Sequence, residues 1–319
     1  MDRKTSAAQT VAYRFLPDYY LAGFTEKNSR EDRIWVLDRR LGTQDSTSPR
    51  EAAREPGIYP PVSGSGDADR TARVINRIAE TQTLPAGGDF SLLMDFIAAM
   101  LLNLPAPRKM VDRFADDLAG KILELAADSR ESYQAFFSKL EEDSGVGVPT
   151  FEEAADVLQS DKHATPEDQH ISIRSRLNPA RLALTHIENR AWGVIVNDSP
   201  DHLFITSDQP TALVSRNKSG YYGPNLRSPD TVIYLPLNGR VVLVGGPGEP
   251  PGTSRVKGVR EVARLNSLVV SGRGRFIISP RENFVYMNSL KRLSFKDELI
   301  IKKLTRTAVP GLKDGGVPS

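Results

Sequence analysis

The sequence contains no cysteine among its 319 residues, which excludes disulfides, thiolate metal sites and a cysteine nucleophile. Long apolar runs are also lacking. The most apolar stretch, Phe90 to Leu104, is too short to span a bilayer and carries Asp95 and Asn103. The first ten residues are polar and have no apolar core of signal-peptide length. We therefore expect a cytoplasmic protein.

The motifs that mark common metal and enzyme sites are missing or incomplete. No two of the four histidines stand four residues apart, and Glu167 with His170 supplies only one of the two Glu-x-x-His copies of a di-iron bundle. No Gly-x-Ser-x-Gly elbow marks a nucleophile. The segment Ser271 to Arg275 leads into a strand instead of a helix, and Gly245 to Gly252 contains three prolines without N–H donors. These patterns predict no metal site and identify no cofactor.

Charge is unevenly distributed along the chain, although the net charge is only +2. Residues 89 to 168 hold 17 acidic and 7 basic side chains, whereas residues 251 to 319 hold 14 basic and 5 acidic ones. One interpretation is that the two parts simply cover each other. The other is a basic face for an anionic partner such as a nucleic acid, a nucleotide or an acidic protein. Its candidate residues are Arg255, Lys257, Arg260 and Arg264.

The order of the sequence patterns predicts an α+β fold. A strand is expected at residues 34 to 38, a long surface loop from Gly42 to Asp69, and helices over residues 70 to 190. After residue 190 the pattern changes to short β-branched runs, including an Asn238-Gly239 hairpin signal and a late helix. Separate blocks of helices and strands favour a helical half packed on a largely antiparallel sheet.

The same patterns predict a single domain. We expect this domain to span residues 13 to 305, with its sheet built from residues 191 to 290 and joined by the strand at residues 34 to 38. A flexible arm over residues 1 to 12 precedes it, and a disordered tail over residues 306 to 319 follows it.

The segment from Phe204 to Pro210 is the strongest candidate for a functional site. Phe204 and Ile205 read as the end of a buried strand, and Pro210 prevents simple continuation of the ladder. Thr206, Ser207 and Asp208 are therefore expected where a strand becomes a loop, and polar groups there can reach a ligand. The competing interpretation is that these side chains satisfy the local backbone, as such residues often do in turns.

Several segments in this order resemble the domain-of-unknown-function 4238 family, a set of uncharacterised bacterial proteins. The segments are the opening box at 14 to 24, Asn103-Leu104-Pro105-Ala106-Pro107-Arg108, Arg190-Ala191-Trp192, Phe204 to Pro210 and Leu235-Pro236-Leu237. The family's boxes typically carry His at the position of Arg14 and Asn at the position of Gln209. A family His acting as a base would be lost here, because Arg stays protonated, whereas an anion-binding role would be kept.

Two hypotheses follow from these residues. The first is a hydrolase or nuclease-like enzyme, or a defence effector, that acts on a phosphate-bearing substrate. The second is a non-catalytic protein that binds an anion or a partner in the same pocket or through the basic C-terminal part. Under the first hypothesis Asp208 and Ser207 are the catalytic candidates. The candidate binding residues are Arg14, Thr206, Gln209, Tyr19 and Tyr20.

Overall fold

The computed structural model describes the helical and the strand-rich parts of the chain, whereas the arm at 1–12 and the tail at 306–319 lie outside the described residues. It describes residues 16–52, 65–102, 105–144, 148–159, 165–177, 183–184, 186–215, 226, 228, 230–248, 252–272 and 274–299. The helices are α1 (Asp18–Ala22), α2 (Pro49–Ala52), α3 (Ser65–Thr81), α4 (Gly88–Leu102), α5 (Pro105–Asp128), α6 (Arg130–Ser144), α7 (Phe151–Gln159), α8 (Pro166–Arg176) and α10 (Val259–Ser271). The strands are β1 (Ile34–Asp38), β2 (Thr43–Thr47), β3 (Ala191–Asn197), β4 (Thr206–Ser207), β5 (Ala212–Ser215), β6 (Thr231–Pro236), β7 (Val241–Gly246), β8 (Thr253–Val256), β9 (Phe276–Ser279), β10 (Val285–Met287) and β11 (Leu293–Phe295).

The strands form two sheets and a separate hairpin. The larger sheet has the order β5-β6-β7-β3-β8 and is antiparallel except for the parallel pair of β3 and β8. The smaller sheet, β2-β1-β9-β4, is antiparallel throughout, and it pairs the early strand β1 with the late strand β9. Strands β10 and β11 pair with each other. This arrangement confirms the α+β fold class.

The expected loop from Gly42 to Asp69 is wrong in part. Residues 43–47 form β2, which pairs with β1 from Ile34↔Thr47 to Asp38↔Thr43, and α3 begins at Ser65. Strand β2 lies at the edge of its sheet and reads Thr-Gln-Asp-Ser-Thr, so it has no apolar alternation to reveal it in the sequence. At the other end of the described chain, β11 ends at Phe295 and a helical stretch over residues 296–299 follows it.

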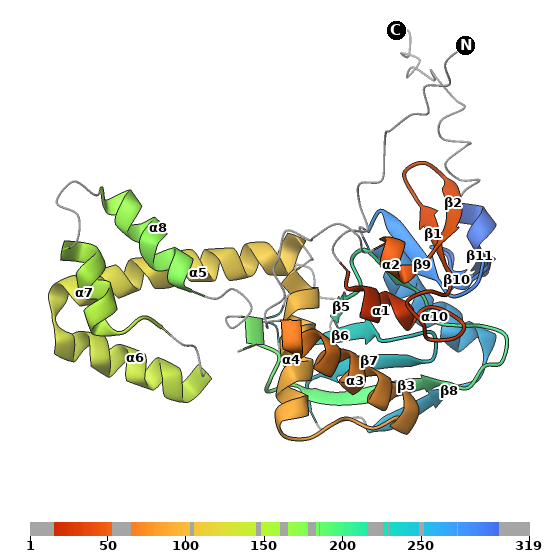
Figure 1. Ribbon diagram of the computed structural model, residues 1–319, viewed down its shortest axis with the longest axis horizontal. Helices are drawn as coiled ribbons and strands as arrows, with labels where there is room; N and C mark the ends of the chain where they lie inside the picture. The colour runs from red at the N-terminus through yellow and green to blue at the C-terminus, as the bar shows by residue number, and fades with distance from the viewer. Residues whose placement is uncertain are drawn as a thin grey trace, which may run out of the picture.

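Helices cover both faces of the five-stranded sheet (Figure 1). Val241 and Leu243 of β7 belong to the main core, which also contains α3 and α4, whereas Val242 packs with Val262 of α10 on the opposite face. Successive residues of a strand point to opposite faces, so a strand buried on both sides must be apolar at every position. The uninterrupted Val-Val-Leu-Val run of β7 therefore follows from its place in the middle of the sheet.

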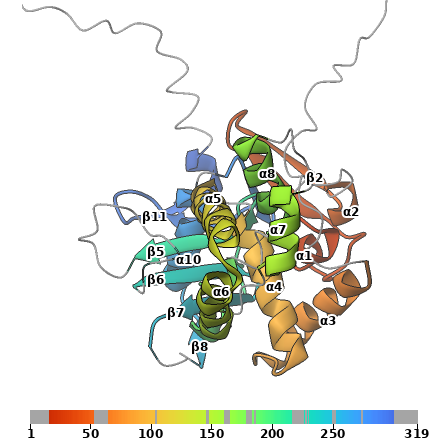
Figure 2. The same cartoon turned by 90° about the vertical axis from the view of Figure 1, so that its left-hand side faces the viewer.

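Helices α5 to α8 extend away from the sheets as a helical lobe, with α6, α7 and α8 arranged around α5 (Figures 1 and 2). The apolar side of α5 includes Val111 and Ile122, which are buried, and Ile173 of α8 is buried in the same core. Arg174 of α8 donates to Asp112 of α5 at 2.9 Å and also pairs with Asp116. The helices predicted before residue 190 thus pack largely on one another.

The predicted Asn-Gly hairpin joins β6 to β7. The Asn238 side-chain oxygen accepts hydrogen bonds from the backbone N–H groups of Arg240 and Val241, both at 2.7 Å. Gly239 donates its N–H to the carbonyl of Gly23, just after α1, at 3.1 Å. A Cβ on Gly23 would lie 2.6 Å from the Leu237 carbonyl oxygen, so the close approach of α1 to this turn requires glycine.

Candidate functional site

Three segments that carry the family resemblance meet at the hydroxyl of Tyr20. This hydroxyl donates to the carbonyl oxygen of Pro236 at 2.8 Å and lies 2.7 Å from Oγ1 of Thr206. Because the single phenolic hydrogen is used on Pro236, Thr206 must be the donor to Tyr20. Both side chains are fully buried, and burial raises the pKa of Tyr20 against the opposing effect of the Thr206 hydrogen bond. The opening box is thus bonded to β4 and to β6.

Tyr19 faces a different part of the structure. It packs at the edge of the main core, with its ring centroid 6.3 Å from that of Phe96 in α4. Burial, together with the nearby charge of Asp18, raises the pKa of Tyr19 to about 12. A tyrosine with so high a pKa stays protonated near neutral pH, so it can donate a hydrogen bond but cannot act as a base.

Ser207 forms a local turn with Gln209. Its hydroxyl donates to the Gln209 carbonyl at 2.7 Å and accepts the Gln209 N–H at 3.1 Å. The Ser207 side chain is buried, so the polar atoms that a nucleophile would use are occupied by the backbone two residues on. Gln209 itself is partly exposed beside this turn.

The carboxylate of Asp208 lies in a seat formed by the start of β9. Oδ2 accepts the backbone N–H of Arg275, and Oδ1 accepts that of Phe276, both at 3.1 Å. A Cβ on Gly274 would lie 2.4 Å from Oδ1, so only glycine leaves room for the carboxylate. Burial raises the pKa of Asp208, although the N–H groups of Phe276 and Arg275 oppose this effect.

Asp38 and Arg39, at the end of β1, complete the arrangement around Asp208; we call Asp38, Arg39, Asp208 and Arg275 the strand-end cluster. Oδ2 of Asp38 accepts from Nε and Nη2 of Arg275 at 3.0 and 2.6 Å, and Oδ1 accepts the backbone N–H groups of Arg40 and Leu41. Burial alone would raise the pKa of Asp38, but the hydrogen bonds from Arg275 and the two N–H groups outweigh it and lower the pKa.

Arg39 binds the glycine-rich segment before β9 through its carbonyl groups. Its Nη1 donates to the carbonyl oxygens of Gly272 and Gly274 at 2.8 and 3.1 Å. The backbone before and at the start of β9 therefore donates the N–H groups of Arg275 and Phe276 to the Asp208 carboxylate, while its Gly272 and Gly274 carbonyls accept from the Arg39 guanidinium. Sequence patterns pointed to Asp208 but not to Asp38, Arg39 or Arg275, because their pairing depends on the contact of β1 with β9. Arg14 lies outside the described residues.

Of the predicted basic residues, Arg255 lies on β8, Lys257 in the link between β8 and α10, and Arg260 and Arg264 on the first turns of α10. Arg255 donates to Asp198 at 2.7 Å and also bonds to the side chain of Gln82. Lys257, Arg260 and Arg264 are exposed, and within the described part of the chain none of them forms an ion pair. The intervening Glu261 accepts the backbone N–H groups of Lys257 and Gly258 at 3.0 and 2.9 Å, so it caps the helix.

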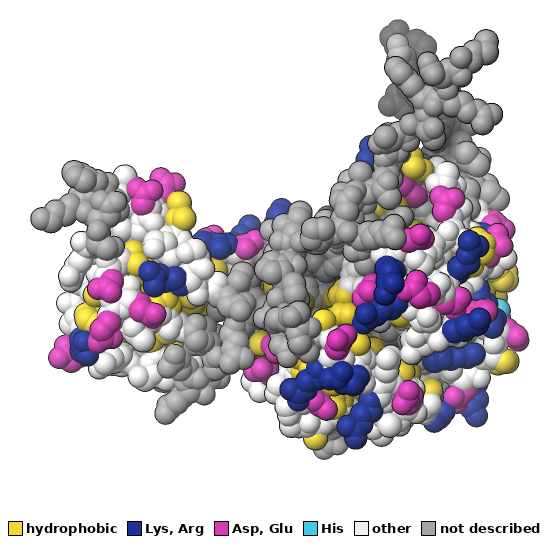
Figure 3. Space-filling view, viewed as in Figure 1, with side chains coloured by type: hydrophobic (Ala, Val, Ile, Leu, Met, Phe, Trp, Pro, Cys, Tyr) yellow, Lys and Arg dark blue, Asp and Glu magenta, His cyan; other side chains and the backbone are white. Residues whose placement is uncertain are grey.

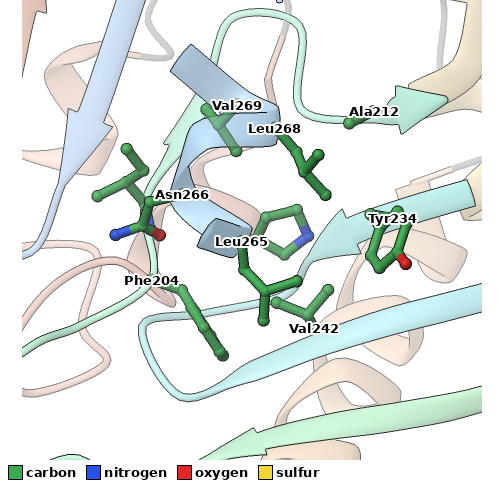
Figure 4. A pocket seen from close by; sticks show the side chains of 10 residues that line it. Phe204, Ala212, Tyr234, Val242, Leu265, Asn266, Leu268 and Val269 are labelled. Carbon is green, nitrogen blue, oxygen red and sulfur yellow. The ribbon is translucent and has the colours of Figure 1, made fainter. Parts of the chain in front are cut away.

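A crevice between α10, β4 and the larger sheet is too small to bind a ligand. Figure 4 shows Phe204, Val242 and Leu265 around it. Its free space of about 10 Å³ would hold no more than about one water molecule. The nearby Asn266 is structural, because its amide donates to the carbonyls of Leu203 and Val285 and its oxygen accepts the Ile205 N–H.

The residues that the structure describes contain no group of three or more His, Asp or Glu side chains that could hold a metal ion. None of the helices there combines the length and the apolar composition needed to cross a membrane.

The fold and the site define an α+β protein in which the opening box, β4 and the β6–β7 hairpin are tied together by buried hydrogen bonds. The family described as "Protein of unknown function (DUF4238)" matches residues 15–283, and the chain belongs to this family. The resemblance predicted from the sequence is thereby confirmed. A search of the curated proteins and a search of the solved structures each found no match.

Proposed function

We propose that the protein binds a nucleic acid through the basic face formed by Arg255, Lys257, Arg260 and Arg264. Three of these four cations are exposed and have no ion-pair partner among the residues described. Unpaired Lys and Arg side chains on one surface bind phosphates and release their condensed counterions, which makes the binding favourable at low salt. The fourth cation, Arg255, is held in place by its ion pair with Asp198.

The hydrogen bonds of Thr206 and Ser207 favour the binding function over catalysis by these two hydroxyls. The Thr206 hydroxyl is directed at Tyr20 and the Ser207 hydroxyl at Gln209, and both side chains are buried. A substrate would have to displace these hydrogen bonds before it could use either hydroxyl. The unpaired cations of the basic face, in contrast, require no such rearrangement.

Fluorescence anisotropy with a labelled single-stranded oligonucleotide tests the proposal. We expect binding that weakens as salt rises, with the logarithm of affinity falling by about 0.7 per phosphate contact for each unit of log salt. The triple variant Lys257→Glu, Arg260→Glu, Arg264→Glu should bind about tenfold more weakly or worse. The triple variant Lys27→Glu, Arg33→Glu, Lys109→Glu alters the net charge equally at exposed cations elsewhere and is the matched control. Equal loss in both variants, or no binding by the wild type, would contradict the proposal.

A second candidate function is hydrolysis of a phosphate-bearing substrate, with Asp208 as the general acid or base. This candidate includes a defence effector with that activity. The raised pKa of Asp208 favours it, because general acid–base catalysis works best with a pKa nearer the working pH. Phosphodiesterase and nucleotide hydrolysis assays on the wild type and on Asp208→Asn test this reading. Activity that survives in Asp208→Asn, or that is absent from the wild type, would count against it.

A further inference from the structure

A groove between α3 and the start of α4 has a mixed polar and apolar lining. It measures about 380 Å³, which is within the range of small-molecule sites. Val74 and Ile78 of α3 are buried and, with Leu84, give it an aliphatic floor. Arg77, Thr81 and Thr83 give it a polar rim. The groove therefore suits a ligand with an apolar body and a polar or charged end.

The hydrogen bonds at the rim define which ligand groups can be recognised. Thr81 donates its hydroxyl hydrogen to the Arg77 carbonyl at 2.8 Å, so Thr83 must be the donor in the 3.0 Å contact between the two threonines. Both hydroxyl oxygens then offer only lone pairs to a ligand. The guanidinium of Arg77 is exposed and forms no ion pair within the ranges that the structure describes.

The carboxylate of Asp89, which also lines the groove, is already paired with a cation. Oδ1 of Asp89, at the start of α4, accepts from Nε and Nη2 of Arg70 at 3.0 and 2.7 Å. A ligand anion would therefore meet the free positive charge of Arg77 without facing an unpaired carboxylate. The rim as a whole presents one cationic donor and two oxygen acceptors above an apolar floor.

The groove is connected to the basic face. Gln82, in the loop that closes the groove, accepts the Thr253 hydroxyl on its carbonyl at 3.0 Å, and its side chain bonds to Arg255. Lys and Arg side chains also gather on the molecular surface over α3 (Figure 3). The loop after α3 is thus hydrogen-bonded to β8, the strand that carries Arg255.

We infer that this groove binds a single nucleoside monophosphate unit of the nucleic acid, an inference that rests on the proposed function. The phosphate pairs with Arg77, the base lies on the aliphatic floor of Val74 and Ile78, and its N–H groups donate to the oxygens of Thr81 and Thr83. One nucleotide is thereby held in the groove while the neighbouring phosphates follow the basic face.

Isothermal titration calorimetry with adenosine 5′-monophosphate, adenosine and inorganic phosphate tests the groove directly. We expect the monophosphate to bind, adenosine to bind about tenfold more weakly for lack of the Arg77 contact, and inorganic phosphate to bind more weakly still. Arg77→Ala and Ala86→Trp, which fills the groove from an exposed rim position, should each reduce monophosphate affinity about tenfold. Arg73→Ala, an exposed arginine on the same helix but outside the groove lining, should leave it unchanged.

The outcomes separate the groove from the basic face. Absence of monophosphate binding, or unchanged affinity in both Arg77→Ala and Ala86→Trp, overturns the groove site even if the oligonucleotide still binds. Monophosphate binding that depends on Arg77 supports the groove site even if the triple charge reversal on α10 leaves oligonucleotide binding unchanged, in which case only the basic face fails. Urea unfolding of each variant shows that affinity is compared between folded proteins.

Discussion

Arg275 and Arg260 come from the same basic part of the chain, but their surroundings differ. Arg275 donates from Nε and Nη2 to Asp38, and its guanidinium carbon lies 4.8 Å from the centroid of the Phe276 ring. Arg260 is exposed and, in the described part of the chain, has no ion pair. One arginine holds two strands together, whereas the other has its charge available to a partner.

The strand-end cluster and the basic face therefore differ in how their polar groups are satisfied. In the cluster the Asp38 and Asp208 carboxylates accept hydrogen bonds from Arg275 and from backbone N–H groups, so removing a member should unfold or loosen the protein. The exposed cations of the basic face contribute little to the free energy of unfolding. Replacing them should therefore change nucleic-acid binding and leave stability nearly unchanged. Stability and binding measurements on the same variants thus separate the two roles.

The largest stability effect is expected for Asp38→Ala. This change leaves the Arg275 guanidinium and the N–H groups of Arg40 and Leu41 without their acceptor in a nearly buried position. We expect a loss of about 3 kcal/mol in the free energy of unfolding, measured with urea. The matched control, Asp198→Ala, breaks the more exposed pair with Arg255 and should cost about 0.5 kcal/mol. Similar losses in both variants would remove the distinction between the two regions.

A smaller effect is expected for Gly274→Ala. Its new Cβ would lie 2.4 Å from Asp208 Oδ1, so the carboxylate has to move out of its seat, which should cost about 2 kcal/mol. Gly120→Ala in α5 is the matched control, because a Cβ there meets nothing within 4 Å and alanine favours the helix. We expect Gly120→Ala to raise the free energy of unfolding by about 0.5 to 1 kcal/mol. A neutral Gly274→Ala would show that Asp208 does not need this seat.

The sequence predicts the elements better than it predicts the contacts between them. Strand 34–38 and the Asn238-Gly239 turn follow from local residue preferences, and both form as predicted. The edge strand at 43–47 was not predicted, because its polar residues gain their order from pairing with β1. Asp208 was singled out from its position after a strand, but its role depends on Gly274 and Arg275, which only the antiparallel pairing of β4 with β9 brings beside it.

The buried hydrogen bond between Tyr20 and Thr206 should contribute less to the free energy of unfolding than the contacts of the strand-end cluster do. Tyr20→Phe removes the donor to Pro236 and the acceptor for Thr206, and we expect a loss of about 1 to 2 kcal/mol. Thr206→Val removes the other side of that contact with little change of shape. A double-mutant cycle by urea unfolding should give a coupling of about 1 kcal/mol. Additive losses would mean that the two hydroxyls do not act together.

The smallest effect is a difference in pH dependence between the two carboxylates of the strand-end cluster. The pKa of Asp208 is raised, mainly by burial, so the folded protein binds its proton more readily than the unfolded chain does. The pKa of Asp38 is lowered, because the hydrogen bonds from Arg275 and the N–H groups outweigh burial, so the folded protein binds that proton less readily. The two groups should therefore shift stability in opposite directions as the pH falls.

These signs can be measured by urea unfolding from about pH 7 to about pH 3 on the wild type, Asp208→Asn and Asp38→Asn. The stability of the wild type relative to Asp208→Asn should grow as the pH falls through the raised pKa of Asp208 toward its unfolded value of about 3.9. The stability of the wild type relative to Asp38→Asn should stay constant above about pH 3.9 and shrink below it, as Asp38 becomes protonated. Parallel curves for the two variants would mean that the N–H groups of Arg275 and Phe276, and not burial, dominate the pKa of Asp208. In that case the raised pKa that favours Asp208 as a general acid would be lost, and only the binding function would remain supported.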